Sequence, residues 1–177
     1  MMIRALVLAA GVATGAVAQD APYAGQDGRA IAQLGEADVA ALLAGEGWGL
    51  ARPAELNGFP GPSHVLELAD ELALSDDQRH EIEQIFHEMQ NDAAALGARY
   101  VETEAWIDEL FGDKQPDPEE LTYLLRSSGE MLAQLRGIHL MAHIRTAPLL
   151  TPHQRMQYAS LRGYGAPDHA GHEGGGH

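Results

Sequence analysis

His139 and His143 are the residues whose type and spacing most clearly predict chemistry. They lie four residues apart in a segment with helical periodicity, so both imidazoles project from one face of the helix. Imidazole nitrogens bind Zn(II), Cu(II) or Ni(II) when they converge at about 2.0–2.2 Å on one ion. The pair alone is equally compatible with two unrelated histidines, so a metal site needs further ligands.

An antiparallel helical hairpin would bring His87 to the level of this pair. If the turn is centred on residues 114–115, facing residues have numbers that sum to about 229, because both helices rise equally per residue. His87 then faces His139 and His143 to within one turn, although it only borders the apolar stripe of its own helix. We therefore expect it to be a third ligand.

His64 is the fourth candidate ligand. It begins a predicted short helix, residues 64–73, which folds back at the junction of residues 74 and 75 and so returns His64 toward the same level. The sequence predicts a site of nitrogen ligands made by His64, His87, His139 and His143. Its expected occupant is a divalent transition metal, namely Cu, Zn or Ni/Co.

The carboxyl-terminal tail carries a second group of potential ligands. His169, His172 and His177 alternate with glycines and stand near Asp168 and Glu173. Such a tract chelates Cu(II), Ni(II) or Zn(II) weakly, since ordering a flexible chain costs affinity. The alternative is an inert solubilising tail.

The elements that must position these histidines are helices. From residue 82 to 110 apolar or small residues recur every three or four positions, and a second run does the same from 121 to 142, which is typical of amphipathic helices. The first stripe is Ile82, Ile85, Met89, Ala93, Leu96, Tyr100, Thr103, Ile107 and Leu110; the second is Leu121, Leu125, Ser128, Leu132, Leu135, His139 and Ala142. Asp117 is the expected N-cap of the second helix and Pro148 ends it.

Two capping boxes mark helix starts. Ser75 with Gln78, and Thr151 with Gln154, each place a hydroxyl three residues before an amide, so each side chain satisfies a backbone N–H that the helix leaves free. The second box begins a short helix that runs to about residue 161. The predicted fold is all-α, a long antiparallel hairpin flanked by short capped helices in a hooked four-helix arrangement.

The two ends of the chain have other roles. Arg4, the apolar run 5–15 and the small residues around Ala18 predict a signal peptide over 1–18, cleaved near Ala18. Residues 19–62 are expected to be an irregular segment with one short helix at 36–44, which packs either on its own hairpin or on a second subunit. Residues 63–162 form the predicted hairpin domain, and 163–177 a disordered tail rich in His and Gly.

Composition excludes several classes of partner. The chain carries 26 Asp+Glu against 11 Lys+Arg, a net charge of −15, which repels nucleic acid and anionic lipid. It contains no Cys, so neither disulfides nor thiolate metal sites are available.

A thin hairpin buries few side chains, and we therefore expect a two-fold homodimer. No motif of a nucleophile, phosphate loop or HExxH metalloprotease is present, so we expect no enzymatic activity.

The twin boxes Leu74-Ser75-Asp76-Asp77-Gln78 and Leu150-Thr151-Pro152-His153-Gln154 resemble the LTxxQ signature of the Spy/CpxP family. That resemblance covers about residues 63–161 and implies a periplasmic protein with a hooked helical hairpin. One branch of the family implies heavy-metal binding as a sensor or buffer in metal resistance and envelope stress, with a membrane-bound regulatory partner. The other branch implies an ATP-independent chaperone of unfolded clients. The histidines favour the metal-binding branch, and the chaperone is the alternative.

Overall fold

The protein is described by a computed structural model that covers residues 23–26, 28–112 and 116–164. The described chain is all-α, as predicted. Its elements are α1 (Glu36–Leu43), α2 (Arg52–Glu55), α3 (Pro62–Glu67), α4 (Asp76–Gly112), α5 (Pro118–Thr146), the 3-10 turn η1 (Ala147–Leu149) and α6 (Pro152–Leu161). The predicted signal peptide and the tail histidines His169, His172 and His177 lie outside the described residues.

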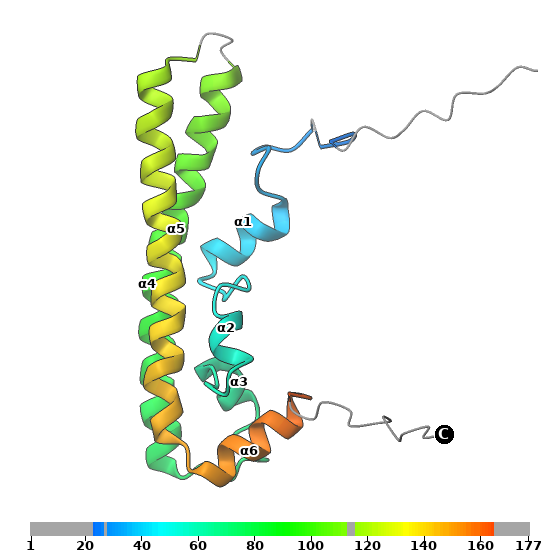
Figure 1. Cartoon of the computed structure of the whole chain (residues 1–177), viewed down its shortest axis with the longest axis vertical. Coiled ribbons are helices and arrows are strands. Elements are labelled where there is room, and N and C mark those ends of the chain that lie inside the picture. The colour runs from blue at the N-terminus through cyan, green and yellow to red at the C-terminus, as the bar shows by residue number, and fades with distance from the viewer. Residues whose placement is uncertain (1–22, 27, 113–115, 165–177) are drawn as a thin grey trace, which may run out of the picture.

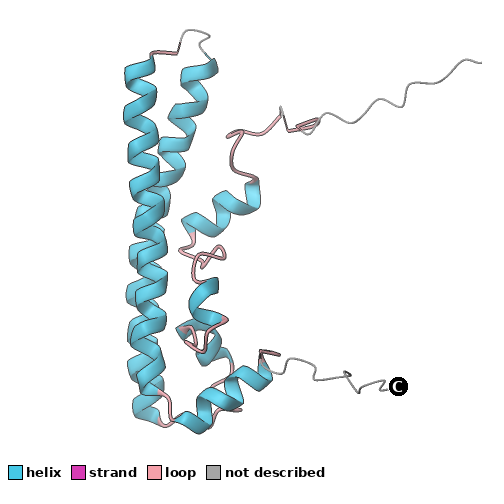
Figure 2. Cartoon of the chain, viewed as in Figure 1, coloured by secondary structure: helices cyan, strands magenta, loops and turns pink. Residues whose placement is uncertain are grey.

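The antiparallel helices α4 and α5 form a long helical pair (Figure 1). The segment from α1 to α3 runs along one side of this pair, and α6 crosses its end, below α3 in the view (Figure 2). The sequence left open whether this amino-terminal segment packs on its own hairpin, and it does, since α1 contacts α4 and α2 contacts α5. No helix of the described part combines the length and the apolar character needed to cross a bilayer.

Both predicted capping boxes are present. The Ser75 N–H donates to Gln78 Oε1 at 3.1 Å, and the Gln78 N–H donates to Ser75 Oγ at 3.2 Å. At the start of α6, the Thr151 N–H donates to Gln154 Oε1 at 2.9 Å, and the Gln154 N–H donates to Thr151 Oγ1 at 3.2 Å. These bonds satisfy backbone donors that have no partner within the helix, and so fix where α4 and α6 begin.

The two boxes also bind each other. Gln78 and Gln154 exchange amide hydrogen bonds, each Nε2 donating to the other Oε1 at 3.0 Å. Gln78 Nε2 also donates to the Leu149 carbonyl at 2.7 Å, and Gln154 Nε2 donates to the Leu72 carbonyl at 3.2 Å. An amide can cap a helix and pair with a second amide at once, because it both donates and accepts. The glutamines therefore join the amino ends of α4 and α6.

An apolar cluster joins α1 to the long helical pair. Its buried residues are Ile31, Leu34, Leu42, Ala93, Leu96, Tyr100, Met131 and Leu135. The helices approach closely here, since a Cβ on Gly97 of α4 would lie only 2.3 Å from the Leu42 carbonyl oxygen of α1. Only glycine leaves room for the α1 backbone at this point.

The predicted stripe of α5 was partly wrong in its first half. Ser128 is buried as predicted, but Leu125 is 54% exposed and Leu132 is half-buried, and Leu124 and Met131 are buried instead. Two neighbouring rows of apolar residues both follow the three-four spacing, so periodicity alone could not select the row that faces α4. From Leu135 onward the predicted stripe is correct, and His139 and Ala142 are buried.

The segment between residues 45 and 73 also differs from the prediction. It contains the short helix α2, which its repeated glycines and prolines concealed. The predicted helix at 64–73 ends at Glu67, and the following turns include Ala73 with φ +47°. That left-handed residue reverses the chain just before the first capping box, so α3 lies beside α4.

Candidate functional site

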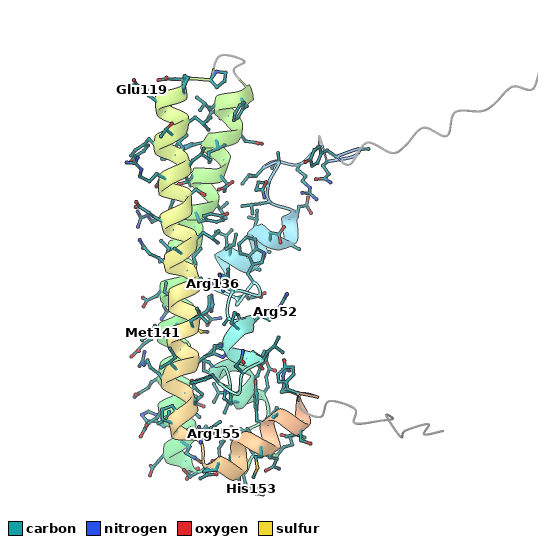
Figure 3. All side chains as sticks on the ribbon, in the orientation of Figure 1. Arg52, Glu119, Arg136, Met141, His153 and Arg155 are labelled. Atoms are coloured by element: carbon teal, nitrogen blue, oxygen red, sulfur yellow. The ribbon has the colours of Figure 1, made fainter. Side chains whose placement is uncertain are left out.

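The candidate site is built around the buried carboxylate of Glu55, the last residue of α2. Only 10% of its side chain is exposed. Ionisable and polar side chains from α3, α5 and α6 surround it, at the end of the molecule where side chains of these helices fill the space between them (Figure 3). A buried carboxylate needs such partners, because removing an unpaired charge from water costs on the order of several kcal/mol even after the protein relaxes.

Three groups surround the Oε1 atom of Glu55. The Tyr158 hydroxyl of α6 donates a hydrogen bond to it. His64 Nδ1 of α3 lies 3.4 Å away and Arg162 Nε lies 3.7 Å away. Burial raises the pKa of Tyr158, and its bond to Glu55 raises it further, so the tyrosine remains a protonated donor throughout the physiological range.

The other carboxylate oxygen, Oε2, is buried and has no hydrogen-bond partner among the described residues. His143 Nδ1 of α5 lies 3.6 Å from it. That nitrogen instead bonds the Phe59 carbonyl oxygen, at 2.7 Å. A buried oxygen that accepts no hydrogen bond lowers the stability of the fold. Here the N–H group closest to that oxygen donates to the Phe59 carbonyl instead.

The contacts of His64 define which ring nitrogen carries its hydrogen. Arg162 Nη2 lies 3.3 Å from His64 Nε2, and a guanidinium can only donate, so Nε2 must accept. The neutral ring therefore carries its hydrogen on Nδ1, which points toward Glu55 and toward the Tyr158 hydroxyl at 3.5 Å. Arg162 thus contacts both the carboxylate and the imidazole.

His139 lies next to this network on α5. It is only 2% exposed, and burial lowers its pKa, with the neighbouring His143 lowering it further. Together with His64 and His143 it lines a cavity of about 440 Å³ between α3, α4, α5 and the loop at residues 45–47. No hydrogen bond to the His139 ring is found within residues 23–26, 28–112 and 116–164. The site therefore includes a neutral imidazole open to a cavity.

The structure brings three of the four predicted ligands together, and His87 is not one of them. His64, His139 and His143 line the same cavity, to which α4 contributes Phe86, Met89 and Gln90. His87 is exposed, and its ring packs against Phe86 with centroids 5.5 Å apart. Because Ile82 and Ile85 are the buried positions of this part of α4, position 87 lies on its exposed side. The predicted height of His87 along the helical pair was correct, but the predicted direction of its side chain was wrong.

Within the described chain, no three His, Asp or Glu side chains already surround one point as a metal site would require. The predicted four-histidine site is therefore not assembled. Two imidazole nitrogens nevertheless lie near the Glu55 carboxylate, one beside each oxygen. Two ligands of one tetrahedral ion lie about 3.3 Å apart when each is about 2.0–2.1 Å from the ion. His64 Nδ1 lies 3.4 Å from Glu55 Oε1, and His143 Nδ1 lies 3.6 Å from Glu55 Oε2, so both distances are close to that spacing.

Sequence reasoning missed Glu55, Tyr158 and Arg162. Glu55 stands in the glycine- and proline-rich stretch that we expected to be irregular, and no spacing rule connects it to His143, 88 positions later. Tyr158 and Arg162 are four residues apart at the end of α6, which places both on one helix face. That spacing was the available signal.

A scan against models of known protein families finds no match, and searches of characterised proteins and of solved structures find none either. The function must therefore be argued from the geometry of the site.

Proposed function

We propose that this chain is an exported metal-binding protein that acts as a sensor or buffer for Zn(II), Cu(II) or Ni(II)/Co(II). Glu55, His64 and His143 are the proposed ligands, and His139 is a further imidazole at the same cavity. The observation that supports this proposal is the buried Glu55 carboxylate. One of its oxygens has no hydrogen-bond partner in the described chain, and an imidazole Nδ1 lies near each of its oxygens. The resemblance of the twin capping boxes to the Spy/CpxP family supports an exported helical protein, and one branch of that family implies metal binding.

A metal ion would take the place of the hydrogen on each Nδ1. His64 and His143 would each carry their hydrogen on Nε2 instead, and His143 Nδ1 would leave the Phe59 carbonyl. Protons compete with the metal for the ligating nitrogens, so binding would weaken at acidic pH. Because the ligands come from α2, α3 and α5, the ion would tie the amino-terminal segment to the long helical pair. A partner that recognises this surface would then distinguish the metal-bound from the metal-free protein.

Calorimetric titration of the mature protein with Zn(II), Cu(II) and Ni(II) tests the proposal. The background carries H169N/H172N/H177N, so that the tail cannot bind metal. We expect one site per chain, and we expect E55Q or H64N/H143N to weaken it at least tenfold, since each removes ligand atoms.

H87N and H153N are the matched controls, because both histidines are exposed on helices of the same domain. We expect neither to alter the affinity. The proposal fails if E55Q and H64N/H143N bind as tightly as their background, or if only the tail histidines bind metal.

A second candidate function is the binding of unfolded clients in the manner of an ATP-independent chaperone. It is favoured by large apolar side chains that are exposed on the long helical pair, namely Trp106, Phe111, Tyr123, Leu125, Met141 and Ile144. Met141 lies on the side of α5 away from the amino-terminal segment (Figure 3). A second copy of the chain would also cover the Met141 side of α5 in the homodimer that we expect.

M141E/I144E tests this second candidate, with H87N as an exposed control. We expect the charged variant to be monomeric by light scattering and to lose any suppression of client aggregation. Suppression that is unchanged by the variant would contradict a client-binding role for this face. Suppression that ignores metal would favour the chaperone over the metal sensor.

A further inference from the structure

We propose that the cavity between α3, α4 and α5 binds a small primary amine, with His139 and His143 accepting hydrogen bonds from its ammonium group. This inference goes beyond the proposed function, because it needs no metal ion and does not involve Glu55, which is not among the residues that line this cavity. The cavity holds about 440 Å³, which is enough for a small organic molecule. Both imidazoles are buried in its wall, His139 being 2% exposed and His143 8%.

The two imidazoles offer acceptor nitrogens. His143 Nδ1 lies 2.7 Å from the Phe59 carbonyl oxygen, and a carbonyl can only accept, so Nδ1 carries the hydrogen of the neutral ring and Nε2 is an acceptor. No hydrogen bond to the His139 ring is found in the described chain, and burial lowers its pKa, with His143 lowering it further. Since a neutral imidazole always has one nitrogen that accepts, His139 can accept a hydrogen bond from a molecule in the cavity.

Two glycines bring the walls of the cavity close to the helices. A Cβ on Gly61 would lie 2.7 Å from Cε1 and 2.8 Å from Nε2 of His143, so a larger residue would displace this edge of the ring. A Cβ on Gly45 would lie 2.2 Å from the Gln90 carbonyl oxygen of α4. The loop at residues 45–47 and the chain just before α3 therefore pack directly on the long helical pair, which gives the cavity defined walls.

Charge selects a cation for this cavity. No Lys or Arg lines it among the described residues, whereas the exposed carboxylates Glu46 and Glu67 do. The whole chain has a net charge of −15, so anions are repelled and cations attracted. An ammonium group also donates three hydrogen bonds and accepts none, which matches two imidazoles that offer acceptors.

The apolar part of the wall selects a ligand with a hydrocarbon body. Ala51, Phe86 and Met89 line the cavity beside the imidazoles, and covering them with methylene groups removes apolar surface from water. A primary ammonium on a short alkyl chain therefore has the required chemistry. Free alkylamines and the lysine side chains of a partner protein share this chemistry.

Calorimetric titration of the metal-free mature protein with n-pentylamine tests the inference. We expect one saturable site per chain, and at least tenfold weaker binding of 1-pentanol, which has the same body without the charge. Lysine with an acetylated amino group and an amidated carboxyl group is the second probe. If pentylamine alone binds, the site serves free amines, and if both bind, it also accepts lysine side chains. Equal affinity for 1-pentanol, or no binding of either amine, would overturn the inference.

H139L removes an acceptor but retains a buried side chain of similar size. We expect it to weaken pentylamine binding about tenfold, while H153L on α6, where the histidine is exposed (Figure 3), leaves the affinity unchanged. Urea unfolding of both variants checks that the fold is retained. Unchanged affinity in a folded H139L protein would show that this imidazole does not contact the ligand.

E67Q does not depend on how a buried substitution folds, because Glu67 is exposed. We expect about threefold weaker binding, as loss of one exposed charge pair predicts, and no change in E102Q, whose carboxylate is exposed on α4 outside the cavity. Equal losses in E67Q and E102Q would show that the amine responds only to net charge, and would overturn a site in this cavity. The metal titrations of the proposed function are separate measurements, so either proposal can fail while the other stands.

Discussion

The contact of α1 with the long helical pair and the contact of α2, α3 and α6 with the same pair are stabilised in different ways. The first is made by an apolar cluster around Leu42 and Leu135 with close backbone approach at Gly97. The second has an apolar layer around Val65 and Ile82, but a carboxylate, two imidazoles, a tyrosine and a guanidinium lie beside it. The same long helices therefore support one contact that is mainly apolar and one that contains a buried carboxylate and its polar partners.

This difference indicates where function lies in the molecule. Apolar burial needs no chemistry beyond shape, and about 25 cal/mol per Å² of buried apolar surface stabilises it. A buried carboxylate costs stability unless its partners compensate it, and Glu55 Oε2 has no hydrogen-bond partner in the described chain. The charged contact is thus the poorer way to hold two elements together, which supports a role for Glu55 beyond holding them.

The largest expected effect comes from removing a side chain from the apolar contact. Leu135 is 1% exposed in the middle of α5, and Leu135→Ala should reduce the free energy of unfolding by about 2–5 kcal/mol, because it removes buried methylenes and leaves a cavity. Urea unfolding followed by circular dichroism measures it. Met141→Ala on the same helix, at a 54% exposed position, should change stability by less than about 0.5 kcal/mol.

Removing Glu55 should destabilise the charged contact less. Glu55→Leu leaves the Tyr158 hydroxyl buried without its acceptor, which should cost about 1–3 kcal/mol. Adding Tyr158→Phe removes the unpaired hydroxyl, so the double variant should regain much of this loss. Chemical denaturation of the single and double variants measures the coupling, and purely additive losses would show that Tyr158 and Glu55 do not act as a pair.

The glutamine pair between the capping boxes should contribute about 1–2 kcal/mol, as a partly buried amide network does. Gln154→Ala breaks the bonds to Gln78 and to the Leu72 carbonyl and also removes half of a capping box. The loss of stability, measured by thermal unfolding, should exceed that of Gln157→Ala. Gln157 bonds only the Glu71 carbonyl and is more exposed. Equal losses would mean that the amide pair adds nothing.

The smallest expected effect is a pH dependence within the apolar contact. The Trp48 indole N–H donates to Asp38 at 2.9 Å, and this bond, followed by that of the Gly35 N–H, lowers the pKa of Asp38. A lowered folded pKa means that the contribution to stability is present above the usual aspartate pKa and is lost as the pH falls through the folded value. In a Trp106→Phe background, Trp48 fluorescence should change at a pH below the ordinary aspartate range, and Asp38→Asn should abolish that step.

The two contacts also differ in how far the sequence predicts them. Hydrophobic spacing predicted α4 and α5, and the capping boxes at Ser75 and Thr151 predicted where α4 and α6 begin. Spacing also predicted that His64, His139 and His143 come to one level, since equal rise along two helices determines height. It failed for His87 because height does not determine rotation, and a shift of one residue turns a side chain by about 100°.

Glu55 could not be predicted in the same way. Its partners come from α3, α5 and α6, so its burial depends on how the amino-terminal segment lies against the long helical pair. Short-range patterns carry no information on such contacts, and the surrounding glycines and prolines resemble an exposed loop. What the sequence did indicate is the type of chemistry, because imidazoles and carboxylates are the only strong metal ligands in a chain without cysteine.

Co(II) titration of the H169N/H172N/H177N protein, followed by visible absorption, tests the central claim most directly, because the d–d spectrum reports the ligands and the geometry of the ion. We predict a saturable spectrum of low-coordinate Co(II) with nitrogen and oxygen ligands, which E55Q and H64N/H143N abolish and H87N leaves intact. A spectrum of hydrated octahedral Co(II) that none of these substitutions alters would contradict a metal site at Glu55.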